Sequence, residues 1–247
     1  MNFADTRART TMRSQFGIET PRLWARVSGV CWLLTIAGGV FAEGLVKSNI
    51  IVGDDAAATL SNIAANEPTY RLAIAAEFGG TATYLALSAI LYLLLAPVNR
   101  PLSLTAAFFS VAGCTIWFLN TVAGMAPLVL QSIPAGAEHG SIQAAAFALV
   151  RLGDEGLMTG MLCFGVHCLL LGFLFARSRF FPWPIGLALS LGGVGYLVGG
   201  VAHIAAPDFA SQIDTIVHLP GLVGESLTAL WLTLVGVNAA NWVERAA

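Results

Sequence analysis

The sequence predicts an all-α fold, a polytopic membrane helix bundle of six transmembrane helices with both termini in the cytoplasm. Three observations predict it. Of the 247 residues, 57% are hydrophobic and only 11% are charged, and the mean hydropathy is +0.76. Six segments reach the length of about 20 apolar residues that a membrane-spanning helix needs. Lys and Arg gather on one side of these segments, and the positive-inside rule assigns that side to the cytoplasm.

The six expected spans alternate between short basic turns and longer polar connections. Glycine and proline inside the spans are compatible with helices, because packing within a membrane tolerates both. Two tight turns, Pro97–Pro101 and Arg177–Phe181, connect spans on the cytoplasmic side. The longer outer connections are 47–70, 131–141 and 207–218. The expected spans are residues 23–46, 71–96, 102–130, 157–176, 184–206 and 219–242.

Two shorter segments outside the spans also have helical patterns. The helical spacing of apolar residues in 56–65 predicts a short amphipathic helix on the outer surface, with Asp54 as its N-cap. Residues 142–152 are apolar but too short to cross a membrane. They either extend the fourth span or form a separate interfacial helix. The spacing of Glu43 with Lys47 predicts an ion pair one helical turn apart.

The chain is expected to contain one folded domain. Residues 1–20 are polar and rich in Arg and Thr, which predicts a disordered cytoplasmic tail, whereas residues 21–247 form the six-helix transmembrane domain. The lipid bilayer is therefore the expected partner. A net charge of −2 and the lack of an extended basic patch beyond the tail argue against nucleic acid. The oligomeric state stays open.

Ionisable and polar residues inside the apolar spans mark the candidate site. Charge within the hydrocarbon region is costly and usually marks function. When the spans are threaded through a bilayer, these residues fall toward the outer side, and Glu77 and Glu225 lie roughly 9 Å below the outer helix ends at about 1.5 Å per residue. We expect one outward-facing pocket between spans two, four, five and six, with Arg151 as counter-ion. The candidate residues are Glu77, Thr81, Tyr84, Asn120, Arg151, Asp154, Glu155, His203, His218 and Glu225.

Such a pocket favours the binding or sensing of a small ligand or cation from the outer side. One alternative is a metal-dependent membrane hydrolase at the outer leaflet, in which a divalent metal activates water. Its ligands would be His203, His218, Glu77 and Glu225, since imidazole and carboxylate groups bind zinc and similar ions. A second alternative is a small transporter or a structural membrane subunit.

Against these functions stands a purely structural role for the two intramembrane glutamates. Glu77 and Glu225 would then pair with Arg71 or Arg151, or be protonated in a low-dielectric site. Whether the protein is an enzyme stays open. Haem is not expected, because His167 has no second histidine at its depth, and nucleotide is not expected, because no Gly-rich phosphate loop occurs.

Several separated motifs resemble one known family. They are Gly53-Asp54, Ala57-Ala58-Thr59, Asn62-Ile63, Ala65-Asn66-Glu67, Arg71-Leu72, Leu95-Ala96-Pro97-Val98-Asn99, the run from Phe164 to Gly172, Phe181-Pro182, and Gly192-Gly193-Val194-Gly195-Tyr196-Leu197. In this order they resemble an uncharacterised bacterial membrane family, domain of unknown function 4386, over residues 22–240. The resemblance implies a bacterial integral membrane protein with six helices. It implies no activity and assigns no residue a role. We expect a multi-pass protein of the bacterial inner (cytoplasmic) membrane.

Overall fold

The computed structural model describes residues 20–133 and 139–246, and all regular elements within these two stretches are helices. The all-α prediction is therefore confirmed. Of the predicted tail, only Thr20 is among the described residues. The elements are α2 (Pro21–Gly39), the π-helical segment η1 (Val40–Lys47), α3 (Ser48–Ile50), α4 (Ala56–Ala65), α5 (Glu67–Ala123), α6 (Ala126–Leu130), α7 (His139–Arg177), α8 (Trp183–Ala205), α9 (Pro207–Leu234) and α10 (Ala239–Ala246).

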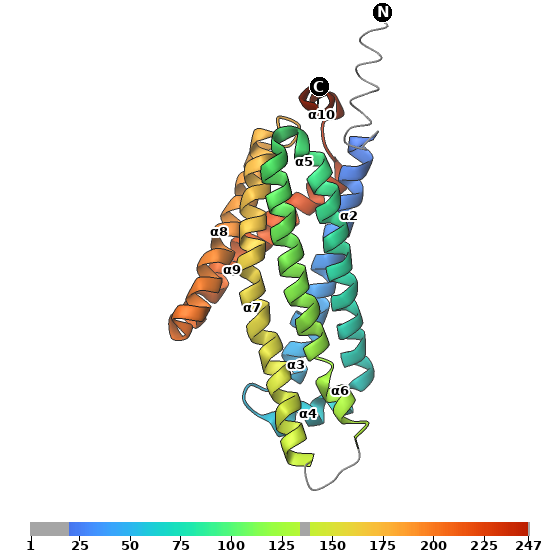
Figure 1. Cartoon of the computed structure of the whole chain (residues 1–247), viewed down its shortest axis with the longest axis vertical. Helices are drawn as coiled ribbons and strands as arrows, with labels where there is room; N and C mark the ends of the chain where they lie inside the picture. Colours follow the sequence, from blue (N-terminus) through green and yellow to red (C-terminus); the bar gives the residue numbers. More distant parts are fainter. Residues whose placement is uncertain (1–19, 134–138, 247) are drawn as a thin grey trace, which may run out of the picture.

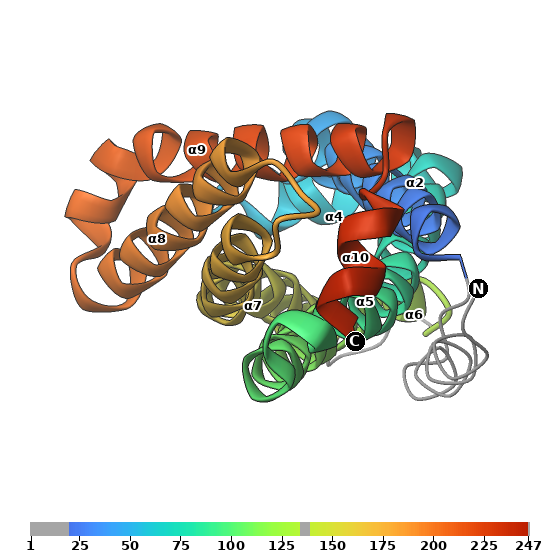
Figure 2. The same cartoon turned by 90° about the horizontal axis from the view of Figure 1, so that it is seen from above.

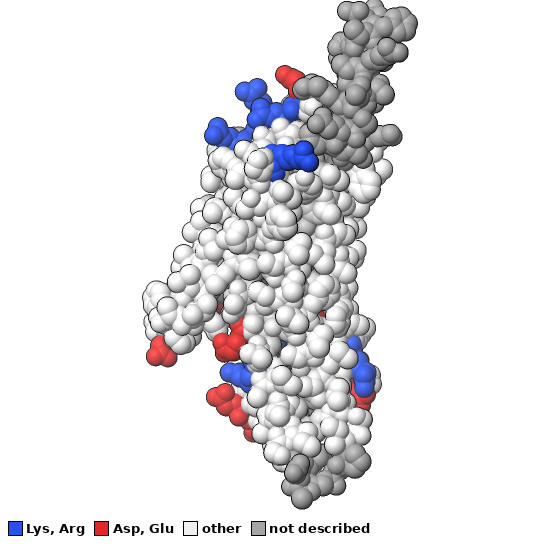
Figure 3. Space-filling model, in the orientation of Figure 1, with Lys and Arg blue, Asp and Glu red and all other residues white. Residues whose placement is uncertain are grey.

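Long apolar helices indicate a membrane protein. Four helical segments in the described part of the chain are long and apolar enough to cross a membrane, and α9 with α10 makes a fifth if this bent pair is one span. Figure 3 shows a broad band without charged side chains around the middle of the visible face, with Lys and Arg gathered above it. The four helices are Pro21–Ile50, Glu67–Leu130, Gly140–Arg177 and Trp183–Ala205.

The longest of these helices folds back on itself. Within α5, Asn99 leaves the helical conformation at φ −161° and ψ 102°, between Pro97 and Pro101. The Asn99 side chain then accepts a hydrogen bond from the backbone N–H of Leu102 at 3.0 Å, as an N-cap does. Two arms result, 67–98 and 100–123, and they run side by side (Figure 1). A buried hydrogen bond of 2.6 Å between the Ser88 and Ser110 hydroxyls links them.

The long helices close into a ring. Viewed along the bundle (Figure 2), α2 packs against α5, α5 against α7, α7 against α8, α8 against α9, and α9 returns to α2. Small residues allow the backbones of neighbouring helices to approach closely. This is usual in membranes, where no hydrophobic effect drives helices together. At Gly186, a side-chain carbon would collide with the backbone of Gly172 on α7. Close contact of α7 with α8 therefore depends on these glycines.

Helix α10 covers one end of this ring. It follows α9 after a bend of 99°, where Gly236 has a φ of +78° that favours glycine. The Trp242 ring is buried, and its Nε1–H donates to the backbone carbonyl of Leu94 at 2.8 Å. We call this end, where α2 also begins, the α10 end, and the opposite end the α4 end (Figure 1).

The structure decides one open alternative of the sequence analysis and corrects two of its predictions. Residues 142–152 continue the fourth span within α7, so they are not a separate helix. Residues 207–218, expected to be a polar loop, are the first turns of α9, because Pro207 and Asp208 suit a helix start. Helix α4 has the predicted bounds, but Asp55 rather than Asp54 caps it, accepting from the Ala58 N–H at 2.9 Å.

Candidate functional site

A cavity of about 60 Å³ lies between α2–η1, both arms of α5, and α7, toward the α4 end. Since a cavity needs at least about 10–15 Å³ of such space to hold one water, this cavity has room for only a few water molecules. Most of its wall is apolar. The polar side chains on the wall are Thr35, Glu43, Lys47, Tyr70, Glu77, Thr81, Trp117, Asn120 and Thr121.

One side of the cavity carries three charged groups. The Lys47 ammonium lies 2.9 Å from the Glu43 carboxylate, as the sequence predicts, and also forms an ion pair with Glu77. The side chains of Lys47 and Glu77 are 12% and 11% exposed, so this pair is largely removed from water. Two carboxylates therefore share one ammonium. A cluster with two carboxyl groups and only one ammonium favours a cationic or hydrogen-bond-donating partner.

The backbone of η1 brings two of these groups together. Glu43 and Lys47 both belong to this π-helical segment. A π-helix closes i→i+5 hydrogen bonds, so its turns hold more residues than α-helical turns, and such segments often occur at functional sites. Glu77 approaches from the first arm of α5, where Gly80 lies against Thr35 of α2. The cluster thus depends on a tight contact of α2 with α5.

The second arm of α5 contributes nitrogen donors to the wall. Within the described part of the chain, neither Trp117 Nε1 nor Asn120 Nδ2 has a hydrogen-bond partner, and both atoms are buried. Glycines of α7 make room for these side chains, with Gly156 against Asn120 and Gly160 against Trp117. Because buried polar atoms in proteins are nearly always paired, these two N–H groups are suited to a ligand that carries an acceptor.

The second intramembrane carboxylate, Glu225, lies in a separate network. Its Oε2 accepts a hydrogen bond from Trp32 Nε1 at 2.9 Å, and its Oε1 accepts one from the Tyr196 hydroxyl at 2.9 Å. The thiol of Cys168 donates to the same Oε1 at 3.8 Å. Side chains from α2, α7, α8 and α9 thus meet at this carboxylate, and the described residues place no cation beside it. Glu225 does not line the 60 Å³ cavity.

His203 and His218 each pair with a different carboxylate and do not form a common site. His203 Nε2 lies 2.6 Å from a Glu155 carboxylate oxygen. His218 Nδ1 lies 3.0 Å from a carboxylate oxygen of Asp214, one turn earlier on α9. The imidazole of His218 is also near the ring of Tyr196, with 5.9 Å between ring centroids.

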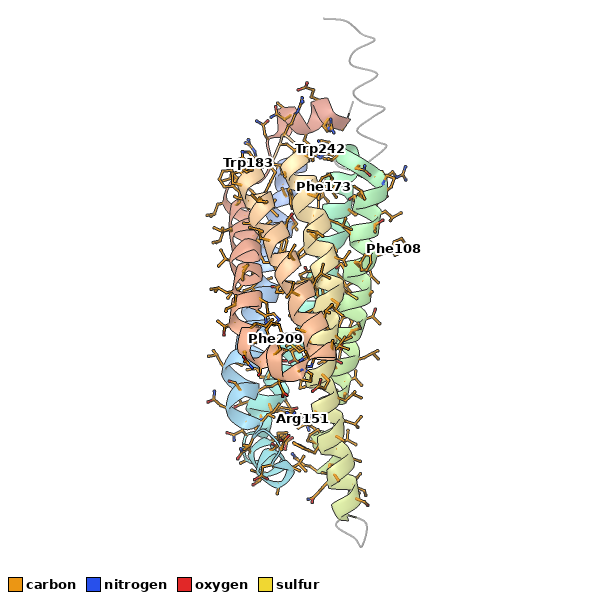
Figure 4. All side chains as sticks on the ribbon, turned by 90° about the vertical axis from the view of Figure 1, so that its left-hand side faces the viewer. Phe108, Arg151, Phe173, Trp183, Phe209 and Trp242 are labelled. Carbon is orange, nitrogen blue, oxygen red and sulfur yellow. The ribbon has the colours of Figure 1, made fainter. Side chains whose placement is uncertain are left out.

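Arg151 is not placed as the counter-ion of Glu77 or Glu225. Its guanidinium lies 3.7 Å from the Asp54 carboxylate, which is almost fully exposed; Figure 4 shows Arg151 near the α4 end. The side chain of Asp154 lies outside the described structure. Arg71 pairs with Glu67 at 2.7 Å, so it does not neutralise Glu77 either.

The expected single pocket is therefore divided. Glu77, Thr81 and Asn120 share the cavity, whereas Tyr84 is buried beside His167 and Phe164 with ring centroids 5.7 and 4.9 Å away. The four proposed metal ligands have separate partners, and over the described residues no three His, Cys, Asp or Glu side chains form a group able to hold a metal ion. Spans one to four, not two, four, five and six, surround the cavity.

Comparison with known families agrees with the motifs. A family model described as domain of unknown function (DUF4386) matches residues 27–236. The chain belongs to the DUF4386 family. Neither a search of curated proteins nor a search of solved structures gives a significant match. The matched DUF4386 region contains both carboxylate sites and ends before α10.

Sequence reasoning missed several functional candidates of this DUF4386 protein. Lys47 and Glu43 were expected to form a pair, but nothing in their spacing indicated that Glu77 would join them, since π-helical backbone has no clear sequence signal. Trp117 lies three residues before Asn120, and this helical spacing was the available signal for a shared face. Trp32 gave no sequence signal of its hydrogen bond to Glu225, because a tryptophan in a membrane span usually packs against apolar side chains.

Proposed function

We propose that this DUF4386 protein binds a small amine that also carries a hydrogen-bond acceptor, in the cavity beside Glu77. One observation carries the proposal: two carboxyl groups share the single ammonium of Lys47 at a cavity whose wall also includes Trp117 and Asn120, and the side-chain N–H groups of these two residues have no hydrogen-bond partner among the described residues. The amine complements the surplus carboxylate charge. The acceptor complements the N–H groups.

The proposal includes a membrane topology. The two arms of α5 count as separate spans, which gives six with α2–η1, α7, α8 and α9 as one domain over residues 21–247. Arginines gather at the α10 end, so the positive-inside rule assigns this end and both termini to the cytoplasm of a bacterium. The cavity, which lies toward the α4 end, then takes its ligand from outside the inner membrane.

The volume of the cavity limits the size of the ligand, and the groups on its wall determine the affinity. A cavity of about 60 Å³, with room for only a few water molecules, admits only a molecule of a few non-hydrogen atoms. A charge-assisted hydrogen bond to Glu77 in this water-poor site contributes roughly 1.5–3 kcal/mol. Most of the remaining wall is apolar, and it limits the ligand to small polar groups joined by a short carbon chain.

The test uses the purified full-length protein in a neutral detergent with ethanolamine, glycine and ammonium as probes. Thermal unfolding is followed as each probe is added. A ligand at about 100 times its dissociation constant stabilises the folded state by about 2.7 kcal/mol, so binding raises the Tm. We expect ethanolamine or glycine to raise it more than ammonium, which lacks an acceptor.

Two variants identify the site. Glu77→Gln removes the carboxylate charge at the cavity, and it should abolish the rise in Tm. Glu225→Gln makes the same chemical change in a network that does not line the cavity, so the rise should persist. No response to any of the three probes would contradict the proposal. An equal response in Glu77→Gln and the unchanged protein would do so as well.

A further inference from the structure

A second polar cavity, of about 190 Å³, lies at the α10 end and is independent of the cavity beside Glu77. Its wall is formed by Ser178, Arg179, Asn241, Glu244 and Arg245. These residues come from the connection between α7 and α8 and from α10. This space is several times the roughly 30 Å³ that one water occupies in the liquid, so a phosphate group fits with a few water molecules.

The fold holds the two parts of this wall together. Asn241 Nδ2 donates to the backbone carbonyl of Arg179 at 3.0 Å, and the Asn238 N–H donates to the carbonyl of Phe180 at 3.0 Å. The Asn238 side chain also accepts hydrogen bonds from the N–H groups of Ala240 and Asn241, which fixes the start of α10. The cavity is therefore built by a fixed contact between α10 and the connection.

Arg179 has an unusual backbone conformation. Its φ is +63°, and among the described residues no other non-glycine residue has a positive φ. Such a conformation costs roughly 1–3 kcal/mol and is concentrated at functional sites. The Ser178 hydroxyl stabilises the turn by donating to the Phe175 carbonyl and accepting from the Phe181 N–H. This turn places Arg179 next to α10 and on the wall of the cavity.

Two guanidinium groups at this cavity lack protein partners. Over residues 20–133 and 139–246, the side chains of Arg179 and Arg245 make neither an ion pair nor a hydrogen bond. The start of α2, the turn of α5 and the end of α7 lie at the same end of the molecule (Figure 1), and they carry Arg22, Arg26, Arg100 and Arg177. Glu244 is the opposing charge on the wall. Arginine binds phosphate through paired N–H groups, so two free guanidinium groups at one cavity suit a phosphate.

The position of the cavity indicates whether the phosphate belongs to a lipid headgroup or to a free solute. Helix α10 lies across the end of the bundle, almost perpendicular to α9, as interfacial helices do. Trp183, which is 64% exposed, lies at the same end (Figure 4), and exposed tryptophans mark the headgroup level of a bilayer. We infer that the cavity between α10 and Arg179 binds the phosphate of an anionic lipid headgroup.

The test compares lipid binding by the full-length protein after delipidation in a neutral detergent. Phosphatidylglycerol, phosphatidylcholine and free glycerol phosphate are titrated, and thermal stability and native mass spectra report binding. We expect phosphatidylglycerol to bind more tightly than phosphatidylcholine, and free glycerol phosphate to have no effect at the same concentration. Arg179→Gln and Arg245→Gln should each weaken phosphatidylglycerol binding about tenfold or more, the factor for the roughly 1.5 kcal/mol that is lost with one charge-assisted hydrogen bond to the phosphate.

Two control variants separate this cavity from general attraction to a basic surface. Arg100→Gln removes a charge from the same end but from outside the cavity wall, and binding should be unchanged. Glu244→Gln removes the opposing charge, and binding should become tighter. Equal weakening by Arg100→Gln would overturn the inference, because the effect would belong to the whole surface. Binding of glycerol phosphate as tight as that of the lipid would overturn the assignment to a headgroup.

Discussion

Glu77 and Glu225 are two carboxylates within one helix bundle, yet they are accommodated in different ways. Glu77 lies beside the Lys47 ammonium, which it shares with Glu43. Glu225 is surrounded by the neutral donors Trp32, Tyr196 and Cys168. Burying a carboxylate is unfavourable unless it is paired or hydrogen-bonded. The protein uses a charge partner at the first site and a set of hydrogen bonds at the second.

The difference separates a candidate binding site from a structural network. Both oxygens of Glu225 have donors from different helices, so a ligand would have to displace a hydrogen bond to bind there. The Glu77 cluster borders a cavity and has two carboxyl groups at one ammonium. A ligand can therefore join this cluster without breaking it. Of the two carboxylates, Glu77 is the better candidate for function and Glu225 for holding α2, α8 and α9 in place.

The largest effect on this comparison is expected from removing the shared ammonium. Lys47→Met leaves Glu43 and Glu77 without their cation, and loss of one partner from a buried ion pair costs roughly 3–5 kcal/mol. The free energy of unfolding, measured in mixed micelles titrated with a denaturing detergent, should fall by this amount. Lys47→Arg, which keeps the charge, should lose less. A fall below about 1 kcal/mol, the range of exposed pairs, would show that the cluster is effectively solvated.

A smaller loss is expected at the second carboxylate. Trp32→Phe keeps an aromatic ring but removes the N–H that donates to Glu225. A buried acceptor that loses its hydrogen-bond partner costs roughly 1–3 kcal/mol, and the free energy of unfolding should fall by that amount. Trp24→Phe on the same helix is the matched control, because Trp24 is 40% exposed and should be tolerated. Equal effects of the two substitutions would mean that the Glu225 network does not stabilise the fold.

A double-mutant cycle sharpens the comparison by measuring how each carboxylate couples to Lys47. Glu77→Gln in the Lys47→Met background removes the carboxylate left without its cation, so part of the lost stability should return. Residues in direct contact usually show coupling energies of about 0.5–3 kcal/mol. Glu225→Gln in the same background should show almost none, since Glu225 has no partner in common with Lys47. Equal coupling would mean that the two sites act as one.

Most of the fold could be predicted from hydropathy and charge alone. Apolar length determines which segments can cross a membrane, and the Pro97–Pro101 turn has two prolines that favour a break in the helix. Residues 207–218 were the main error. Asp208, Asp214 and His218 made this stretch look like a polar loop, but polar residues are compatible with a helix where it extends beyond the apolar region.

The site could be predicted only in part, because its geometry depends on how helices rotate against one another. Glu77 and Thr81 are four residues apart, which places them on one helix face, and both line the cavity. Helical periodicity does not determine which neighbouring helix that face meets. Glycine contacts, such as Gly80 against Thr35, determine the pairing of α5 with α2, and so bring Lys47 to Glu77 instead of Arg151.

The smallest effect is expected at an ion pair outside both sites. Arg71 and Glu67 form a pair at 2.7 Å with side chains that are 54% and 36% exposed, in contrast to the largely buried pair of Lys47 with Glu77. Exposed pairs contribute about 0–1 kcal/mol and are screened by salt. Arg71→Ala should therefore lower the free energy of unfolding by at most that amount, and less still at about 1 M salt, where the screening length falls to about 3 Å. The Lys47→Met loss should change much less with salt. If both losses shrink in parallel as salt is added, water and ions reach the Glu77 cluster as freely as they reach Arg71, and burial does not distinguish the two pairs.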